Sequence, residues 1–457
     1  MASRSWEKLN NPEDAALAKN YKLLLKQSIG GPAKPIVKKG ATVKKGTLLA
    51  QPEGLGVNLH ASVSGKITEI TDTYIVITAD AKQPKDFEPI PKADTSKPAG
   101  IVEMVKAAGI CGMGGAGFPT YVKLGTDLKG GAIVVNAVEC EPLLKHNIKQ
   151  IMTQSEKIRR GILLSMQATN AGRCIFAIKA KNADAIEAFR KVIKDGDNIE
   201  IAELPDLYPM GEERAIIRET MGTMLGVDQL PAVAGAVILN VETISRIAEA
   251  VDERRPVISK DLTVVGKVGK DRESHVYLDV PIGTSVQELI DMTGGFDGEY
   301  GEIIMGGPFT GKSCKPEDVV VKTTGGIIVT MEFLNEKRPL GLLVCACGAN
   351  EDRLREIAGK MNAKVVGVQK CKQAQDVRGA LKCENPGNCP GQAEKIMELR
   401  KAGAQAVLCS NCSDCTNTVM CVAPKLKMAV HHETDHVMRT VGHALIRRLP
   451  IEECTFK

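Results

Sequence analysis

The chain has 457 residues, enough for about three domains that each bury a core, and its 43% apolar and 25% charged residues are typical of a globular protein. The net charge of +5 is small and only 3% of residues are aromatic, which argues against nucleic-acid binding by base stacking. No apolar run approaches the roughly 20 residues that cross a bilayer, and the charged N-terminal segment is not a secretory signal. We therefore expect a soluble, cytoplasmic protein with no membrane span.

The first two predicted units are a helical N-terminal arm over residues 1–27 and a small β-barrel or sandwich over 28–98. Short apolar strands alternate with glycine turns in the second unit, as in such folds. The repeated Val-Lys-Lys-Gly pattern resembles the barrel-sandwich fold of biotinyl and lipoyl carriers, which present a lysine on an exposed hairpin. The corresponding segment here, "PEGLGVNLHA", has no lysine, so we expect a structural module.

The rest of the chain is predicted to contain two α/β regions with a smaller unit between them. Residues 99–258 alternate buried strands such as "GAIVVNAVE" with amphipathic helices. Residues 259–312 form a compact β-β-α unit, in which Thr284 or Ser285 caps the helix, and 313–338 form a linker. Residues 339–457 predict a small parallel sheet whose cysteines lie at the carboxyl ends of strands, where α/β folds place their chemistry.

The segment "GICGMGGAGFPTYVKL" is the strongest candidate for a binding loop. Gly112, Gly114 and Gly117 have the G-x-G-x-x-G spacing, but a Rossmann loop needs a strand before it and a helix that begins inside it. The preceding residues have helical spacing, and Pro119 interrupts a helix, so we expect a different phosphate-binding loop. Glycines let successive N–H groups converge on a phosphate, whereas an isolated glycine-rich segment is more often a simple turn.

Three further motifs follow this loop in order: "VVNAVECEP", "YPMGEERAIIRETMG" and "VILNVETI". Together the four motifs resemble the NADH-binding flavoprotein subunit of respiratory complex I and, more closely, RnfC proteins, over about residues 28–330. The resemblance implies an α/β multidomain fold. Its parts are a barrel-sandwich hybrid, an α/β flavin/NADH-binding domain of the complex I flavoprotein type, a β-grasp unit of the SLBB type and a Cys-rich C-terminal α/β domain.

The same resemblance implies that NADH and FMN are the cofactors and assigns residues to them. The residues expected around the flavin are Gly112, Gly114, Gly115, Gly117 and Lys123, with Asn136 and Asn240 supplying neutral hydrogen bonds. Glu139, Glu141 and Glu212 match positions that in the family face the flavin and the nicotinamide nucleotide, where a carboxylate can accept hydrogen bonds from ribose hydroxyls. The alternative for Glu139 and Glu141 is a pair of solvated carboxylates at a strand end.

The sequence also departs from the family, because RnfC proteins carry two ferredoxin-type cysteine runs after the β-grasp unit. Residues 319–341 contain no cysteine, whereas ten of the fourteen cysteines fall between Cys345 and Cys454. The first candidate for an electron outlet is therefore "CSNCSDCTNTVMC", with Cys409, Cys412, Cys415 and Cys421 as ligands. A 4Fe–4S cluster, a zinc ion or thiol–disulfide exchange each suit this spacing.

Two other cysteine features are candidates for the group that takes electrons from the flavin. Cys111 lies inside the glycine loop near Lys123, where converging N–H groups are expected to lower its pKa and make it a catalytic thiolate together with Glu139. The alternative is a small packed residue. The segment from Cys345 to Cys389 resembles the N-terminal domain of heterodisulfide-reductase flavoprotein subunits, where a Cys-x-Cys-Gly strand end precedes a set of cluster ligands.

RnfC-like proteins without ferredoxin runs include the PrdC proteins, which transfer electrons to the D-proline reductase of amino-acid-fermenting anaerobes. The resemblance therefore implies a soluble NADH-dependent oxidoreductase that passes electrons to a partner reductase, with D-proline reductase as the expected partner. Two alternatives remain open at this point. One is a peripheral NADH-binding subunit of an Rnf-type complex, and the other is a docking scaffold that has lost its nucleotide.

Overall fold

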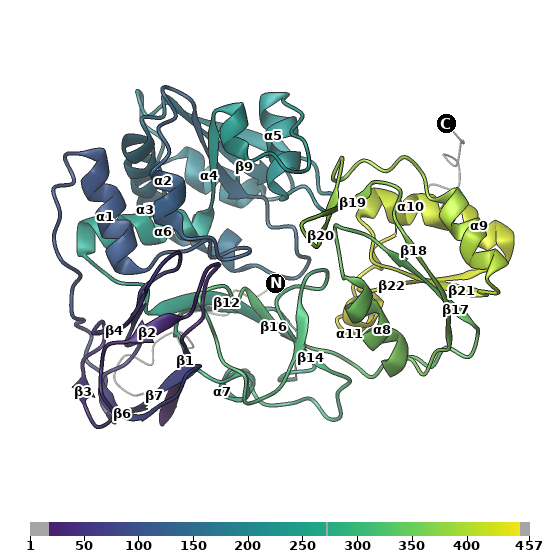
Figure 1. Ribbon diagram of the computed structural model, residues 1–457, viewed down its shortest axis with the longest axis horizontal. Helices are drawn as coiled ribbons and strands as arrows, with labels where there is room; N and C mark the ends of the chain where they lie inside the picture. Colours follow the sequence, from purple (N-terminus) through teal and green to yellow (C-terminus); the bar gives the residue numbers. More distant parts are fainter. Residues whose placement is uncertain (1–17, 271–272, 448–457) are drawn as a thin grey trace.

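A computed structural model describes residues 18–270 and 273–447. Figure 1 shows the barrel and the β-grasp unit below the middle α/β domain, with the C-terminal domain as a separate lobe beside them. Within the described residues, no helix has both the length and the apolar composition that a membrane span requires.

The N-terminal barrel consists of two small antiparallel sheets around a core that includes Tyr21, Leu49 and Ile75. The strands are β1 (Asn20–Leu24), β2 (Ala33–Pro35), β3 (Thr42–Val43), β4 (Leu48–Pro52), β5 (Leu59–His60), β6 (Gly65–Ile70) and β7 (Tyr74–Ala79). The prediction of a helical arm is wrong for β1, whose side chains alternate between buried and more exposed and which pairs with β7. The rest of the predicted arm, residues 1–17, lies outside the described residues.

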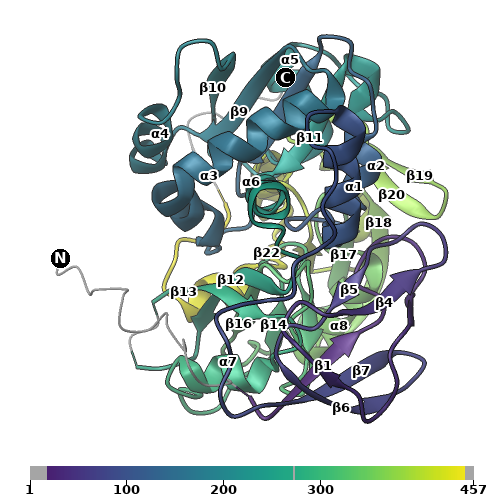
Figure 2. The same cartoon turned by 90° about the vertical axis from the view of Figure 1, so that its left-hand side faces the viewer.

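The middle domain contains a parallel sheet in the order β10-β9-β8-β11. Its strands are β8 (Ala132–Ala137), β9 (Arg173–Lys179), β10 (Ile199–Leu204) and β11 (Ala236–Asn240). Figure 2 shows α3 running across one face of this sheet, and α3 also packs against α6. The helices are α1 (Pro98–Ala108), α2 (Thr120–Leu124), α3 (His146–Thr169), α4 (Ala183–Arg190), α5 (Glu213–Met221) and α6 (Val241–Ala248). Because α1 leads directly into the glycine loop, the exclusion of a Rossmann loop is confirmed.

The β-grasp unit has a five-stranded sheet in the order β13-β12-β16-β14-β15, with one helix, α7 (Val286–Met292). Its strands are β12 (Ser259–Gly266), β13 (His275–Pro281), β14 (Ile303–Met305), β15 (Lys312–Cys314) and β16 (Gly326–Val329). Ser285 and Glu288 form a capping box at the start of α7, which confirms Ser285 as the cap. The predicted linker over 313–338 is wrong, because the fully buried β16 lies within it and pairs with both β12 and β14.

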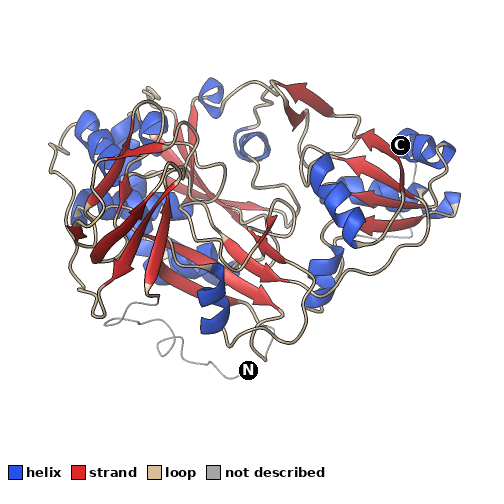
Figure 3. Ribbon diagram, turned by 60° about the horizontal axis from the view of Figure 1, so that its bottom comes forward, coloured by secondary structure: helices blue, strands red, loops and turns tan. Residues whose placement is uncertain are grey.

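The C-terminal domain has a parallel sheet in the order β18-β17-β21-β22, which Figure 3 shows flanked by helices. Its strands are β17 (Leu340–Val344), β18 (Val365–Lys370), β21 (Ala406–Cys409) and β22 (Ala429–His432), and its helices are α8 (Glu351–Lys360), α9 (Ala393–Lys401), α10 (Ser413–Val422) and α11 (Asp435–Thr440). The predicted parallel sheet with cysteines at its carboxyl ends is confirmed. An unpredicted hairpin, β19 (Ala374–Val377) and β20 (Ala380–Cys383), lies between the lobes in Figure 1.

A buried ionic cluster joins the middle domain to the β-grasp unit. The Lys260 ammonium on β12 donates to the Glu242 carboxylate on α6, and both side chains are fully buried. Arg246 of the same helix contacts the Asp261 carboxylate at 3.2 Å. The cluster fixes α6, and therefore Asn240 at its N-terminus, relative to the β-grasp sheet.

Candidate functional site

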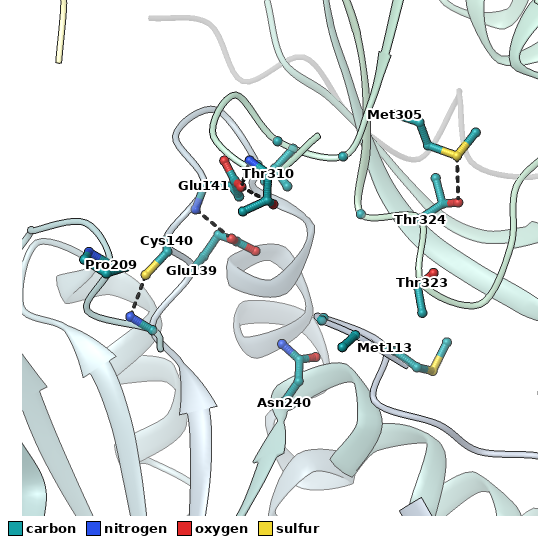
Figure 4. A pocket seen from close by; sticks show the side chains of 18 of the residues that line it. Met113, Glu139, Cys140, Glu141, Pro209, Asn240, Met305, Thr310, Thr323 and Thr324 are labelled. Carbon is teal, nitrogen blue, oxygen red and sulfur yellow. Dashed lines mark hydrogen bonds between the residues drawn. The ribbon is translucent and has the colours of Figure 1, made fainter. Parts of the chain in front are cut away.

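A cavity of about 1000 Å³ lies where the middle domain, the β-grasp unit and the C-terminal domain meet. Figure 4 shows Glu139, Cys140 and Glu141 on one side of it and Met113 with Asn240 on another. The β-grasp unit contributes Gly307 and Thr310, and the C-terminal domain contributes residues around Cys347 and Cys383. The cavity therefore connects the predicted binding loop with the cysteine-rich domain.

The glycine loop presents unpaired backbone amides to this cavity. The loop is anchored at its start, since Gly112 N donates to Phe118 O at 2.9 Å and Met113 N donates to Thr243 Oγ1 at 3.0 Å. The next three residues, 114–116, are exposed cavity-lining residues, and their amides donate no hydrogen bond to any described residue. A Cβ atom at Gly115 would meet no atom within 4 Å, whereas one at Gly114 would lie 2.3 Å from Asn240 Nδ2. Adjacent free amides of this kind form a site for an anion.

Only some of the glycine-loop residues predicted to surround the flavin line the cavity. Gly114 and Gly115 do, whereas Gly112 and Gly117 shape the loop from behind, Gly117 with a φ of +73°. Lys123 is not among the lining residues, because its ammonium on α2 donates to the Glu213 carboxylate at 2.7 Å and to Ile238 O at 3.0 Å. The structure therefore does not bring the Lys123 charge to the loop amides.

Arg214 supplies a cation that sequence reasoning missed. This residue of α5 lines the cavity with 9% of its surface exposed, and its Nε donates to Glu212 Oε1 at 2.9 Å. Its Nη1 is buried and has no hydrogen-bond partner among the described residues. A buried guanidinium nitrogen without an acceptor favours an anionic ligand. The only signal in the sequence is that this arginine lies within the motif "YPMGEERAIIRETMG", directly after two glutamates.

Cys111 does not have the predicted thiolate character. Its side chain is completely buried, lies outside the cavity lining and points toward Gln27 O at 3.9 Å. Burial raises the pKa of the Cys111 thiol to about 11, and this effect outweighs the opposing Lys322 cation. The lowered pKa was expected from the loop amides, but these lie further along the loop. The alternative of a small packed residue agrees with the structure.

Glu139 follows β8 in the cavity wall, where burial raises the pKa of its carboxyl group to about 7. Its Oε1 accepts from Glu141 N at 3.0 Å, and its Oε2 contacts Asn147 Nδ2 at 3.1 Å. Within the described residues Asn147 Oδ1 is buried without a partner. A flip of that amide would let Oδ1 accept a hydrogen bond from the O–H of a neutral Glu139. Glu139 can therefore hold or release a proton near neutral pH.

The remaining predicted residues all line the cavity, but their side chains already hold the backbone. Glu141 accepts from Phe309 N and Thr310 N, each at 2.8 Å, and so tethers the β-grasp unit, as Figure 4 shows for Thr310. Glu212 caps α5, Asn240 caps α6 and the Asn136 amide donates to Gly211 O at 2.9 Å. These side chains shape the site and leave little carboxylate capacity free for ribose hydroxyls.

The predicted ligand set Cys409, Cys412, Cys415 and Cys421 is not assembled. Cys409 ends β21 and donates to His431 O at 3.3 Å, and Cys421 on α10 is disulfide-bonded. The Cys415 sulfur instead contacts three other sulfurs, which defines an inner group of Cys371, Cys389, Cys412 and Cys415. No group of three or more histidine, cysteine or acidic residues in the described part of the chain is arranged to hold a metal ion.

A second set, the outer group, consists of Cys345, Cys347 and Cys383. The Cys347 sulfur contacts both other sulfurs, and the Cys345 sulfur contacts Cys371 of the inner group. Cys347 and Cys383 line the cavity. A chain of sulfur contacts therefore leads from the cavity wall into the C-terminal domain.

Tyr208 fixes the C-terminal domain against the cavity. Its hydroxyl donates to Cys347 O, and its backbone exchanges two hydrogen bonds with Ser413 at 3.1 and 3.2 Å. The Tyr208 ring stacks on Phe309 with 3.6 Å between the centroids. Nearby, Arg218 donates to Asn385 Oδ1 at 2.6 Å. One segment of the middle domain thus determines where the cysteine domain lies.

Comparisons with known proteins agree with this architecture. Residues 7–83 match the RnfC barrel-sandwich hybrid domain, and residues 105–249 match the Nuo51 FMN-binding domain. The chain is 34% identical over 333 residues to a subunit of the Na(+)-translocating ferredoxin:NAD(+) oxidoreductase complex of Acetobacterium woodii, covering 69% of this chain and 74% of that protein. It is 40% identical over 230 residues to the cobalamin reductase PduS of Salmonella typhimurium, about half of each chain. A solved NAD+-reducing NiFe hydrogenase covers 52% of this chain and 47% of its own, with a TM-score of 0.45 and 22% identity.

The residues of the cavity fit FMN, the cofactor of the matched domain. The volume is at the upper end of the usual range for ligand sites, about 300–1,000 Å³. The three free amides of residues 114–116 would hold its phosphate, and Arg214 adds a cation to the wall of the same cavity. When bound, FMN supplies the hydride and single-electron chemistry that side chains lack.

Replacing Gly115 by valine should weaken FMN binding without loss of stability. A side chain there meets no protein atom, but it fills the space above the free amides. Hydrogen bonds to charged groups contribute about 1.5–3 kcal/mol each, so we expect the dissociation constant to rise about 10-fold or more. Quenching of FMN fluorescence measures the affinity. Gly31→Val, at another open glycine in the barrel, is the control. Equal FMN affinities for Gly115→Val and the unmodified chain would rule out the loop as the phosphate site.

The raised pKa of Glu139 predicts a pH-dependent stability. The folded chain keeps this proton up to about pH 7, whereas the unfolded chain releases it near the ordinary value of 4.5. Because the folded state binds more protons in this range, the unmodified chain should lose stability relative to Glu139→Gln as the pH rises from 5 to 8. Thermal midpoints across this range measure the difference, with Glu103→Gln on the exposed side of α1 as the control. Parallel pH profiles for the unmodified chain and Glu139→Gln would contradict the assignment.

Proposed function

Since this chain belongs to the RnfC family, whose members are subunits of ion-translocating ferredoxin:NAD(+) oxidoreductase complexes, we propose that it is an NADH-dependent flavoprotein that passes electrons to a partner reductase. The observation that carries the proposal is the set of three free loop amides at a cavity that Arg214 also lines. Both FMN and NADH present phosphates, and together these groups offer amide donors and a cation to them.

Glu139 is proposed to manage the proton that accompanies hydride transfer. Oxidation of NADH by a flavin consumes one proton from solution in addition to the hydride. A carboxyl group in the cavity wall whose pKa is about 7 is close to half protonated at neutral pH, so it can both deliver and regain that proton. Glu141 is less suited to this task, since the backbone of Phe309 and Thr310 occupies its oxygens.

The inner cysteine group is proposed to replace the missing ferredoxin runs as the ligands of a 4Fe–4S cluster. Four cysteine sulfurs from different segments meet the ligand requirement. Three N–H groups already donate to these sulfurs: Gly391 N and Asn411 Nδ2 at 3.3 and 2.6 Å, and Gln392 Nε2 at 3.2 Å. Such donors stabilise ligating thiolates and tune their potential. The thiols now contact one another, so a cluster requires them to move apart.

The loaded chain tests the proposal. The FMN-reconstituted protein, prepared without oxygen, should lose its flavin absorbance on addition of one equivalent of NADH. If no flavin binds, or if NADH leaves it oxidised, the chain is a scaffold without nucleotide.

The inner group makes a separate prediction about iron. Cys371→Ser should lose most of the bound iron and sulfide, whereas Cys409→Ala should keep both, because Cys409 is bonded to His431 O outside the group. Chemical iron and sulfide analysis of both variants decides the ligand set. Loss of iron from Cys409→Ala would instead support the run that begins at Cys409, and a chain without iron would leave thiol chemistry as the outlet.

The partner is proposed to be D-proline reductase, on the basis of the resemblance to PrdC proteins and the absence of cysteines from residues 319–341. In this role the chain is a cytoplasmic carrier. The 34% identical relative, which is part of a Na(+)-translocating complex, favours a second candidate function as a peripheral subunit of an Rnf-type complex.

Two electron acceptors are compared: purified D-proline reductase, and membranes whose Rnf-type complex has lost its native RnfC protein. Electron transfer from the NADH-reduced chain should be faster to D-proline reductase. Anaerobic stopped-flow reoxidation measures both rates. Faster reoxidation by the membranes would favour the second candidate.

A further inference from the structure

Two cysteines of the outer group lie on opposite segments of the cavity wall. Cys347 follows β17 at the carboxyl edge of the C-terminal sheet, and Cys383 ends the hairpin strand β20. Both line the cavity that contains the glycine loop, and both are free thiols. The inner cysteine group is absent from the lining. The outer pair is therefore the nearest cysteine chemistry that a ligand in the cavity meets from this domain.

The two sulfurs are in direct contact. The Cys347 and Cys383 side chains interact within hydrogen-bonding range, the arrangement from which a disulfide of about 2 Å can form. The wall is also fixed on the Cys347 side, because the Tyr208 hydroxyl donates to Cys347 O. Cys383 in turn contacts Gln373 Oε1 at 3.3 Å. A pair held in this way is positioned to open and close without unfolding of the sheet.

The local charges differ at the two sulfurs. The interaction with Cys347 and the hydrogen bond from the Asn385 backbone, with a smaller contribution from Arg214, lower the pKa of Cys383 below its usual range. The contacts of Cys347 with the Cys345 and Cys383 sulfurs, together with burial, raise its own pKa. One partner is thus biased toward thiolate and the other toward thiol, the asymmetry that thiol–disulfide exchange uses.

We propose that Cys347 and Cys383 form a redox-active disulfide that receives two electrons from the flavin site and passes them to a disulfide of the partner. The proposal rests on the proposed function, since NADH is the reductant. The balanced step is NADH plus one proton plus the disulfide, giving NAD+ and two thiols, with cleavage of the S–S bond. In the second step the two thiols reduce a partner disulfide by exchange, so the bond between Cys347 and Cys383 forms again and the partner gains two thiols.

Other cavity cysteines do not offer this chemistry. Burial raises the pKa of Cys140 to about 12, and its sulfur accepts from Gly211 N. Cys314 lies on β15, and burial raises its pKa to about 12 as well. Among the lining cysteines of the described chain, only Cys347 and Cys383 are in sulfur–sulfur contact.

Thiol counting on the full FMN-loaded chain tests the pair. The protein is oxidised with diamide, freed of reagent and treated with one equivalent of NADH without oxygen, and thiols are then counted after denaturation. We expect two additional thiols per chain. Cys347→Ser and Cys383→Ser should each gain none, and the matched control Cys409→Ala should gain two. Peptide mapping of the oxidised chain should show the residue 347 peptide joined to the residue 383 peptide.

Several results would overturn the proposal. The first is a disulfide that maps to other cysteines, and the second is bleaching of the flavin by NADH without a gain in thiols. The third is loss of iron from Cys347→Ser, which would make the Cys347 sulfur a cluster ligand. If NADH does not reduce the flavin, the proposed function fails, but the pair is still tested. Dithiothreitol titration of the mapped disulfide should then show a reversible two-electron transition that Cys383→Ala lacks, and an irreversible or absent transition would contradict the pair.

Discussion

The backbone amides of residues 114–116 have no acceptor in the described chain, so they require an anionic group in the cavity. The rest of the site is arranged around this requirement. The loop cannot turn these amides inward, because the neighbouring residues Gly112 and Met113 are already bonded to protein. Behind the loop, Asn240 caps α6, and the buried contact between Glu242 and Lys260 holds that helix to the β-grasp sheet. Breaking such a buried ion pair typically costs about 3–5 kcal/mol, so the position of the anion site depends on the interface between two domains.

The carboxyl groups around the cavity would repel an anionic cofactor if all were ionised. Burial raises the pKa of Glu139 to about 7 and raises the pKa of Glu141 as well. Glu141 is in addition neutralised in part by backbone donors of the β-grasp unit. The acidic wall is therefore less negative than its composition indicates, and Arg214 adds a positive charge. This balance is what a site for phosphates requires.

Periodicity predicted most of the regular elements, because long apolar strands and amphipathic helices carry a strong local signal. It failed at β1 and β16, where only four or five residues pair with distant strands, and at the hairpin β19–β20, whose strands have only four residues each. For the site, local motifs identified Gly114, Gly115 and Glu139 as candidates. They could not reveal that Lys123 is bonded to Glu213 or that Cys371 lies beside Cys415, since both facts depend on contacts between segments far apart in sequence.

The segment 208–218 shows how a chain without ferredoxin runs can still connect a flavin site to cysteines. Tyr208 contacts Cys347 O, and Arg218 bonds to Asn385 after the hairpin. Arg214 lines the cavity and adds to the lowered pKa of Cys383, whose first cause is the interaction with Cys347. The residue pattern that resembles a nucleotide-binding motif therefore also carries the surface on which the C-terminal domain docks. Because each of these three side chains contacts or acts on the cysteine domain, the placement of the outer pair at the cavity follows from the same residues that shape the anion site.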